Sequence, residues 1–348
     1  MSFHRVGVVG LGIMGAGIVE VFAKSGIQVV GVAESDAAVE LGKTNLAKSL
    51  GRAVEREKIT QAQADEISGR VVWGSEFALM SDCDLVVEAA PEIMALKKSI
   101  FENLDANVKP GGILATNTSS LSVAAIAAVT RRPAQVIGMH FFNPAPVQKF
   151  VEVISHAGTS ADITHQVVQL AKDLGKSPAS IGDQPGFIVN KLLLAYLNHA
   201  MSICDRGVAK ETIDAAMREL AKFPMGPLEL TDLIGLDTCY EILLTIAADT
   251  GNPQHKPAAS LTALVEQGNK GRKTGSGYYD YSAKHEEPAS ADEAGKSAVY
   301  DELMRAYLQS AVEMNESGYA TQGDIDLGMK LGCGLPEGPF ETLNHFSL

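Results

Sequence analysis

The 348-residue sequence predicts an α/β protein: a doubly wound, mostly parallel sheet at the N-terminus, followed by an all-α domain. Three observations favour this fold class. A buried strand runs straight into a glycine turn and a helix over residues 5–25. Short apolar runs then alternate with helical segments as far as residue 181, which is typical of parallel strands joined by helices. Beyond that point strand-like runs fade and helical periodicity remains.

The first of these units carries a dinucleotide-binding signature. Residues 5–10 form a strand that enters the segment Gly-Leu-Gly-Ile-Met-Gly, and a helix follows until Gly26 ends it. Glycines there allow a tight turn and close backbone approach, and the start of the helix then faces a pyrophosphate with unpaired N–H groups. The sequence therefore predicts a Rossmann-type site for NAD. Its expected cofactor contacts in the turn are Gly10, Gly12, Ile13, Met14 and Gly15.

An acid follows the next strand. Residues 28–33 end on Glu34, which lies 34 − 15 = 19 positions after Gly15, close to the usual spacing of the residue that binds the adenosine ribose. A carboxylate at this place would repel a 2′-phosphate, so NAD is favoured over NADP. Two alternatives remain open: Glu34 is a solvated loop acid, or Asp36 binds the ribose.

The sheet continues with further strands and helices. Strands are expected at residues 71–73, 84–88, 112–115 and 135–138, with a helix at 94–104 and a helical hairpin at 39–50 and 59–67. Polar residues cluster after the strand at 112–115, where Asn117 and Ser119 fall at its carboxyl end. Ligands bind at that end of open α/β sheets. The competing interpretation is a cap for a helix at 123–128, which Ser122 or Ser120 could provide, leaving Ser119 unexplained.

A histidine and a glutamate are expected to meet further along. The apolar run 136–139 ends on His140, two prolines turn the chain at 143–146, and a second apolar run at 150–154 contains Glu152. Runs joined in this way should lie side by side. A carboxylate behind an imidazole fixes its tautomer and stabilises its charged form, as a general base near neutral pH requires. The alternative is that His140 is a structural histidine in the core, with its hydrogen bonds satisfied there, and that Glu152 lies on the surface.

The second half is helical and contains a repeat. Helices are expected at residues 188–204, 210–220, 228–248 with a break at Gly235, and 257–267, followed by a glycine-rich closing loop at 271–281. Seven residues recur at an offset of 112, from Ile213 to Glu229 and again from Ile325 to Glu341, whereas near Asp301 the tail lacks a match to Asn190. The second copy is thus expected to be a packing unit. The predicted domains are 1–183, 184–281 and 297–348, with a linker at 282–296.

Composition restricts the partners and the compartment. The net charge of −13 disfavours nucleic acid and acidic membrane surfaces in general, and no basic run offsets it. No apolar run reaches about 18 residues, the start leaves no room for a signal peptide, and the four scattered cysteines lack metal-ligand spacing. We therefore expect a cytoplasmic protein with reduced thiols and no metal.

Several motifs resemble the L-3-hydroxyacyl-CoA dehydrogenase family, in particular its 3-hydroxybutyryl-CoA dehydrogenases. Besides the glycine turn they are Val-Glu-Ala89-x-x-Glu92 with Lys97, the segments 117–121, 140–144, 185–190, 224–227 and 235–238, and the Lys-Thr-Gly-x-Gly-Tyr-Tyr loop at 273–279. The tail resembles the partial second helical copy in the dehydrogenase part of multifunctional fatty-acid oxidation proteins. The resemblance implies oxidation of L-3-hydroxyacyl-CoA with NAD, and a homodimer that the in-cis copy would weaken.

The same resemblance implies site roles. His140 would be the general base oriented by Glu152, and Ser119 and Asn190 would hydrogen-bond the reacting oxygen. Ala89, Glu92, Lys97 and Asn117 match positions on the cofactor side. Two other interpretations compete. One is a 3-hydroxyisobutyrate-type dehydrogenase, whose catalytic lysine would be Lys191. The other is a dehydrogenase homologue that has lost its activity and serves as a binding or structural protein.

Overall fold

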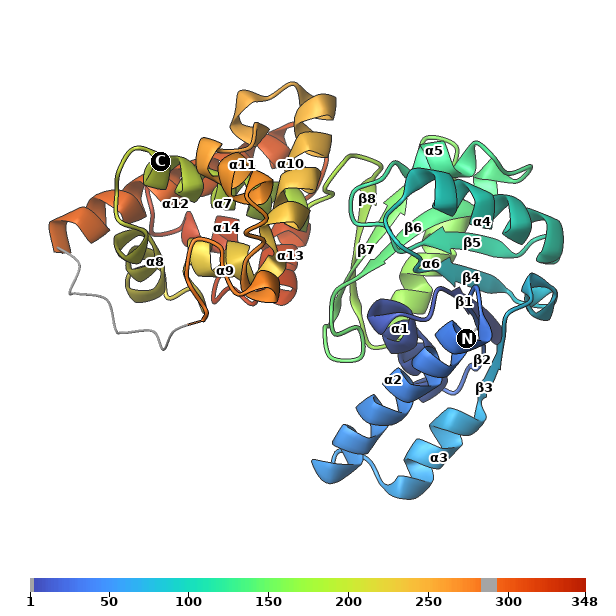
Figure 1. Ribbon diagram of the computed structural model, residues 1–348. Coiled ribbons are helices and arrows are strands. Elements are labelled where there is room, and N and C mark those ends of the chain that lie inside the picture. The colour runs from blue at the N-terminus through green and yellow to red at the C-terminus, as the bar shows by residue number, and fades with distance from the viewer. Residues whose placement is uncertain (1–2, 283–292) are drawn as a thin grey trace. The chain divides into compact units, whose positions relative to one another are not determined.

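The computed structural model describes residues 3–282 and 293–348, and the chain divides into two compact units, Met1–Gln184 and Pro185–Leu348. The first contains the sheet and the second is helical (Figure 1). The sequence placed the end of the first domain at residue 183, one residue earlier. It placed a partial repeat of the helical domain at residues 297–348, and the second compact unit includes these residues.

An eight-stranded sheet forms the first unit, in the order β3-β2-β1-β4-β5-β6-β7-β8. The strands are β1 (Arg5–Val9), β2 (Gln28–Val32), β3 (Val71–Gly74), β4 (Leu85–Glu88), β5 (Ile113–Thr116), β6 (Val136–Phe141), β7 (Phe150–Ser155) and β8 (Ser177–Gly182). Neighbours from β3 to β6 pair in parallel, β7 runs antiparallel to β6, and β8 is parallel to β7. The prediction of a doubly wound, mostly parallel sheet is confirmed.

Helices cover both faces of this sheet. They are α1 (Ile13–Lys24), α2 (Asp36–Glu55), α3 (Gln61–Gly69), α4 (Met94–Asn107), α5 (Val123–Ala127) and α6 (Ala161–Asp173). Phe22 of α1 and Val167 of α6 share one core cluster with Val8, Met139 and Val153 of the sheet. Helices α4 and α5 pack against β4 and β6 and against each other (Figure 1).

Side-chain alternation decides where His140 points. Met139 and Phe141 belong to the core cluster under α1 and α6, as do Val151 and Val153 of the facing strand. Successive side chains of a strand point to opposite faces, so His140 and Glu152 both point to the other face. The strand register places them directly opposite each other. The predicted pairing of the two runs is therefore confirmed.

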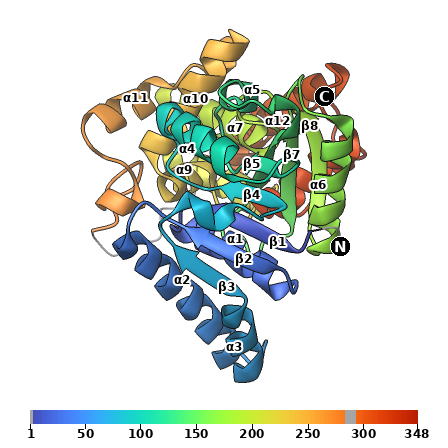
Figure 2. The ribbon, with the colours of Figure 1, turned by 90° about the vertical axis from the view of Figure 1, so that its right-hand side faces the viewer.

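The charged segment after β2 forms a helical hairpin. Helices α2 and α3 lie side by side, as Figure 2 shows. Ser35 caps α2 by accepting from Ala38 N–H at 3.3 Å, and Thr60 caps α3 by accepting from Gln63 N–H at 3.2 Å. These caps satisfy N–H groups that have no partner inside the helix, and so they set where each helix begins.

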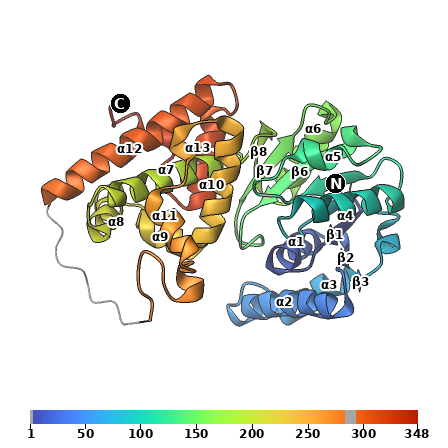
Figure 3. The same cartoon turned by 45° about the horizontal axis from the view of Figure 1, so that its top comes forward.

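The second unit is all-helical. It contains α7 (Val189–Asp205), α8 (Lys210–Glu219), α9 (Pro227–Ile234), α10 (Leu236–Thr250), α11 (Ala259–Glu266), α12 (Glu293–Glu316), α13 (Gln322–Cys333) and α14 (Pro339–Thr342). Gly235, at φ +105°, separates α9 from α10, as the sequence predicted. The long helices α7 and α12 pack against each other (Figure 3).

The repeated residues make the same contacts in both copies. Asp214 of α8 accepts hydrogen bonds from the N–H groups of Leu228 and Glu229, at the start of α9, at 2.8 and 3.1 Å. At an offset of 112, Asp326 of α13 accepts from Phe340 N–H, at the start of α14, at 2.7 Å. The second copy therefore repeats a helix-capping unit.

The linker prediction at 282–296 is partly wrong. Residues 283–292 lie outside the described residues, and residues 293–296 form the first turn of α12 instead. The closing loop is fixed by Asp232, which accepts from the backbone N–H groups of Tyr278 and Tyr279, both at 2.9 Å. Gly271 and Gly277 lie so close to Asp232 that a Cβ on either would come within 2.3 Å of it.

Candidate active site and cofactor cradle

A different geometric feature explains why glycine stands at each of three positions in the turn after β1. Gly10 has φ +86°, and a Cβ there would lie 2.8 Å from the backbone of Ala89 and Ala90. A Cβ on Gly15 would lie 1.7 Å from the Gly10 carbonyl oxygen, so this glycine lets α1 pack against β1. A Cβ on Gly12 would meet no described atom within 4 Å. The open space at Gly12, at the start of α1, fits a pyrophosphate.

The α1 start is also where Ile13 and Met14 lie. Ile13 is 73% exposed, whereas Met14 is half-buried against the core. Gly12, at the N-cap position, provides no side-chain hydrogen bond to the first turn of α1. Backbone N–H groups at the helix start are thus left to a ligand, because a glycine cap cannot satisfy them.

A cavity of about 370 Å³ adjoins the turn and is lined by Gly10, Glu34 and the apolar side chains of Phe77 and Ile100, among others. Its apolar walls suit a base, and the Glu34 carboxylate suits ribose hydroxyls. Asp36 instead occupies the first turn of α2. The residues present therefore fit the adenosine half of NAD, and Glu34 lines the cavity where a ribose ligand is expected.

A buried ion pair lies at the carboxyl end of β4. Lys97, 1% exposed, donates to both oxygens of Glu88 at 2.8 and 3.0 Å and to the Ala90 carbonyl at 3.2 Å. Glu88 also accepts from Thr116 Oγ1 at 2.7 Å. Glu92 lies 3.4 Å from the Lys97 ammonium. Lys97, expected on the cofactor side, thus holds the loop after β4 in shape.

Glu92 in turn organises the serine segment after β5. One of its oxygens accepts from Thr118 Oγ1 at 2.5 Å, from Ser119 N–H at 2.8 Å and from Ser120 N–H at 3.0 Å. Burial alone would raise the pKa of Glu92, but the Lys97 ammonium and these donors lower it overall. Glu92 is therefore an anionic anchor for the backbone of Ser119.

Asn117 joins two neighbouring strands at the same edge. Its side-chain oxygen accepts from Phe141 N–H at 2.8 Å, next to His140. Its own backbone N–H donates to the Glu88 carbonyl at 2.7 Å. The amide side chain thus fixes the end of β6 relative to β5.

A continuous hydrogen-bonded row joins Ser119, His140 and Glu152. Ser119 Oγ lies 3.1 Å from His140 Nε2, and His140 Nδ1 lies 2.6 Å from Glu152 Oε2. Glu152 is fully buried, and His140 is 5% exposed. Because a carboxylate only accepts, Nδ1 donates to Glu152; in the neutral ring this leaves Nε2 as the acceptor that faces Ser119.

The turn after β6 lines a second cavity, of about 280 Å³. Its other walls come from α1 and from α2, which provides Lys48 and Arg52. The turn itself provides residues 143–146. Two cations in a cavity directly after the His140 strand suit an anionic group such as a phosphate.

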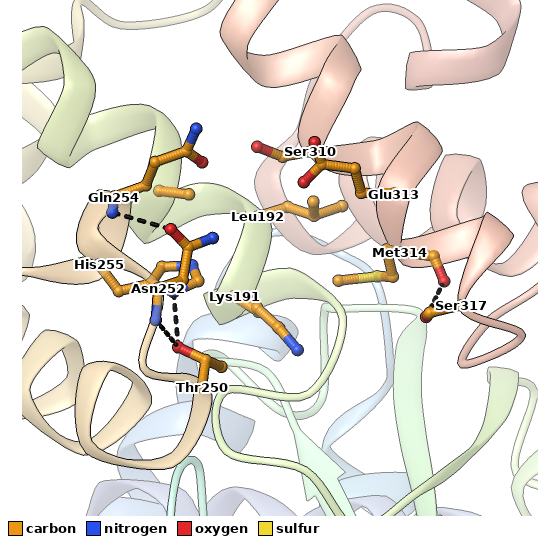
Figure 4. A pocket seen from close by; sticks show the side chains of 11 residues that line it. Lys191, Leu192, Thr250, Asn252, Gln254, His255, Ser310, Glu313, Met314 and Ser317 are labelled. Carbon is orange, nitrogen blue, oxygen red and sulfur yellow. Dashed lines mark hydrogen bonds between the residues drawn. The ribbon is translucent and has the colours of Figure 1, made fainter.

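The helical unit contains the fourth expected catalytic residue. Asn190 lies in the first turn of α7, as predicted. Its neighbour Lys191 lines a cavity of about 250 Å³ with Thr250, His255 and Glu313 (Figure 4). Burial lowers the pKa of Lys191 and, together with the Lys191 charge, that of His255.

Three residues at the site were given no role from the sequence. Glu88, quoted only as part of a motif, is the partner of Lys97. Asp183 caps the segment after Ser119 by accepting from Ser122 Oγ at 2.9 Å and Ala124 N–H at 2.8 Å. Lys176 holds the turn after β6. The burial pattern of β4 could have indicated Glu88, since an acid inside an apolar strand needs a partner. No local pattern marks the other two.

A dinucleotide cradle beside a His–Glu pair on a doubly wound sheet is the arrangement of an NAD-dependent dehydrogenase. Residues 5–184 match the 3-hydroxyacyl-CoA dehydrogenase NAD binding domain, and residues 186–281 and 299–348 match the C-terminal domain of the same enzymes. The chain belongs to the 3-hydroxyacyl-CoA dehydrogenase family and is an NAD-dependent oxidoreductase.

Relatives of known sequence and structure agree with this assignment. A probable 3-hydroxybutyryl-CoA dehydrogenase of Deinococcus radiodurans is 42% identical over 278 residues, which are 80% of this chain and all of the relative. The human mitochondrial hydroxyacyl-coenzyme A dehydrogenase is 41% identical over 80% of this chain and 91% of its own length. The crystal structure of an Escherichia coli 3-hydroxybutyryl-CoA dehydrogenase has a TM-score of 0.92 at 29% identity, covering 99% of this chain and 92% of that one.

The family membership removes the 3-hydroxyisobutyrate-type interpretation, in which Lys191 would have been catalytic. The two C-terminal matches coincide with the two copies of the repeat. Across residues 3–282 and 293–348, no helix is both long and apolar enough to cross a membrane. The same described residues contain no cluster of three or more side chains able to hold a metal ion.

Proposed function

We propose that His140 is the general base of the oxidation, oriented by Glu152, and that Ser119 and Asn190 hold the reacting oxygen. The observation that carries this proposal is the row from Ser119 Oγ through both ring nitrogens of His140 to Glu152, with contacts of 3.1 and 2.6 Å. Bound NAD would supply the acceptor for the hydride that leaves C3 of the substrate. His140 Nε2 accepts the proton of the 3-hydroxyl group, and the Glu152 carboxylate stabilises the imidazolium that results.

Ser119 supports the proton transfer by its position. Its backbone is anchored by Glu92 and its hydroxyl lies within hydrogen-bonding distance of His140 Nε2. A hydroxyl group held there donates to the substrate oxygen while that oxygen loses its proton to the ring. Such preorganised donors stabilise the charge that develops on the oxygen. In the reverse direction the His140 imidazolium is the acid.

His140→Gln tests this assignment. Glutamine keeps a polar side chain of similar reach but cannot take up the proton, so kcat should fall by about 10²–10⁴-fold. NADH should still bind with wild-type affinity, because the cofactor cradle is untouched. The measurement is NADH formation from 3-hydroxybutyryl-CoA, with NADH titrated by fluorescence. More than about a tenth of the wild-type rate would contradict a general-base role.

The substrate is proposed to be a short-chain L-3-hydroxyacyl-CoA. Relatives described as 3-hydroxybutyryl-CoA dehydrogenases support this choice, and the cavity with Lys48 and Arg52 suits the phosphates of coenzyme A. A dicarboxylic substrate is a second candidate, since a 3-hydroxyadipyl-CoA dehydrogenase of Escherichia coli is 40% identical, although the chain covers 61% of it. Comparing kcat/KM over C4 to C16 substrates and an ω-carboxylated one decides between them.

We further propose that the protein is cytoplasmic and that the second helical copy weakens homodimerisation. Tyr196 of α7, Phe223 and Tyr307 of α12 form a cluster of edge-to-face rings between the two copies. An apolar face of the first copy is thus covered in cis, which reduces the surface left for a second chain.

A further inference from the structure

The turn between β6 and β7 contributes to two parts of the site. It begins directly after the end of β6, two residues beyond His140. Its residues 143–146 form a wall of the cavity that contains Lys48 and Arg52. Asn143 and Pro144 are exposed, whereas Ala145 is 2% exposed. Gly17 of α1 lies against the inner side, where a Cβ would be 3.2 Å from Ala145 and Pro146. The position of this cavity wall therefore depends on the contacts that hold the turn in place.

Lys176 provides that support. Its ammonium group donates to the carbonyl oxygens of Ala145 and Gln148, both at 2.6 Å. The side chain is 9% exposed. The backbone at Lys176 is fixed between α6 and β8. The Lys176 N–H donates to the Ala171 carbonyl at 2.9 Å, and the Ser177 N–H donates to the Lys149 carbonyl at 2.7 Å. From this fixed backbone, two charge-assisted hydrogen bonds of the ammonium hold both ends of the segment from Ala145 to Gln148.

The charges around Lys176 come from α1. Glu20, 1% exposed, accepts from Lys24 through one oxygen, and its other oxygen has no hydrogen-bond partner among the described residues. Burial and the Lys24 charge lower the pKa of Lys176 to about 8, against the favourable charge of Glu20. Glu20 also lines the cavity that contains Lys48 and Arg52. The ammonium group is therefore expected to lose its proton near pH 8, below the usual range of a lysine.

We propose that Lys176 is a positioning residue for the acyl-CoA substrate: its side chain holds the 143–148 turn in place through its two hydrogen bonds to Ala145 and Gln148. This rests on the proposed function, in which the turn borders the substrate phosphates. A neutral amine keeps two N–H donors, but hydrogen bonds from an ammonium are roughly twice as strong. The turn is therefore less firmly held above the pKa. Lys176 donates to the 143–148 turn and not to the glycine turn after β1, so NADH affinity should change little.

Lys176→Met tests the anchor, because it keeps the length and the apolar stem and removes the donor. KM for 3-hydroxybutyryl-CoA should rise about tenfold or more, on the scale of hydrogen bonds to charged groups, with little change in kcat or in NADH affinity. Lys172→Met, at an exposed lysine of α6, is the matched control. An unchanged KM in Lys176→Met overturns the proposal, and so does a parallel loss of kcat and NADH affinity, which would indicate general damage.

The pH profile separates positioning from packing. In the wild type, KM should rise on the alkaline side near pH 8, the pKa that burial gives Lys176. In Lys176→Met the profile should be flat. Lys176→Arg, which stays charged throughout, should restore a low KM without the alkaline rise. Glu20→Gln should shift the rise to lower pH, because it removes the charge that favours the ammonium.

Failure of this inference is distinguishable from failure of the proposed function. If the wild type does not oxidise 3-hydroxyacyl-CoA, the proposed function is wrong before any variant is made. If Lys176→Met does not fold, Lys176→Arg decides: an alkaline rise in KM identical to the wild type in that variant would overturn the proposal, and its disappearance would support it.

Discussion

The carboxylate of Glu152 is fully buried and touches the ring nitrogen of His140 that faces away from Ser119. A buried glutamate on a strand is costly unless it is paired. Here the histidine is its partner, and the antiparallel register places the two side chains opposite each other. The pair therefore needs both the strand alternation and the turn that sets the register.

Glu152→Gln should separate orientation from substrate binding. The amide oxygen can still accept from Nδ1, but it cannot stabilise the imidazolium by charge, so kcat should fall by about 10²-fold. KM and NADH affinity should stay close to wild type. Glu102→Gln, at an exposed position of α4, is the control. Wild-type turnover in Glu152→Gln would show that the carboxylate charge is irrelevant to the reaction.

At the same scale, we expect Glu34 to set the preference for NAD over NADP. Since it lines the adenosine-sized cavity, Glu34→Gln should raise KM for NAD and reduce discrimination against NADP by about tenfold, equivalent to about 1.4 kcal/mol. The measurement is the ratio of kcat/KM for the two cofactors. Asp36→Asn is the comparison, because Asp36 was the alternative ribose ligand. A changed ratio in Asp36→Asn alone would reverse the assignment.

At the scale of elements, the two copies of the repeat offer a comparison inside one chain. Asp214 accepts from two N–H groups of α9 and from Tyr279 Oη at 2.8 Å, whereas Asp326 accepts from the start of α14 and is less deeply buried. Asp214→Ala should lower the free energy of unfolding by about 3 kcal/mol, and Asp326→Ala by about half as much. Urea unfolding measures both. Equal losses would mean that burial does not decide the strength of the cap.

The same aspartate should make stability depend on pH. Burial raises the pKa of the Asp214 carboxyl group from 3.8 to about 7. Between these two pH values the folded protein holds a proton on Asp214 that the unfolded chain has lost. Its contribution to stability is complete below pH 3.8 and is lost as the pH rises through 7. Asp214→Asn should remove this slope. If the unfolding curves of the variant and the wild type keep the same pH slope, Asp214 is not the titrating group.

For the whole molecule, the second copy bears on association. Helix α12 packs along α7 and α8 and covers Tyr196, which is 5% exposed. We expect the full chain to be a monomer at micromolar concentration, and a chain ending at residue 282 to dimerise or aggregate because that face is uncovered. Light scattering after size exclusion measures both. A stable dimer of the full chain would contradict a role of the second copy in limiting association.

Local patterns were enough to predict much of this protein. The strand–glycine–helix unit, the alternation of strands and helices and the break at Gly235 all depend on neighbours in sequence, and the repeat was visible by comparing the sequence with itself. The pairing of His140 with Glu152 likewise depends on residues close in sequence, because a short turn joins their strands. Interactions between residues close in sequence decide these local features, and the spacing of apolar residues along the chain indicates them.

Other features depended on the tertiary structure, because the residues involved are remote from one another or follow no local period. Lys176 reaches carbonyls 28 and 31 residues earlier, Asp183 caps a segment some 60 residues before it, and Lys97 turns inward to Glu88. The sequence alone determined the fold class, the nucleotide cradle and the His140–Glu152 pair. Which buried charges support that site was decided only by packing, since burial and the direction of a side chain are set by the whole folded unit.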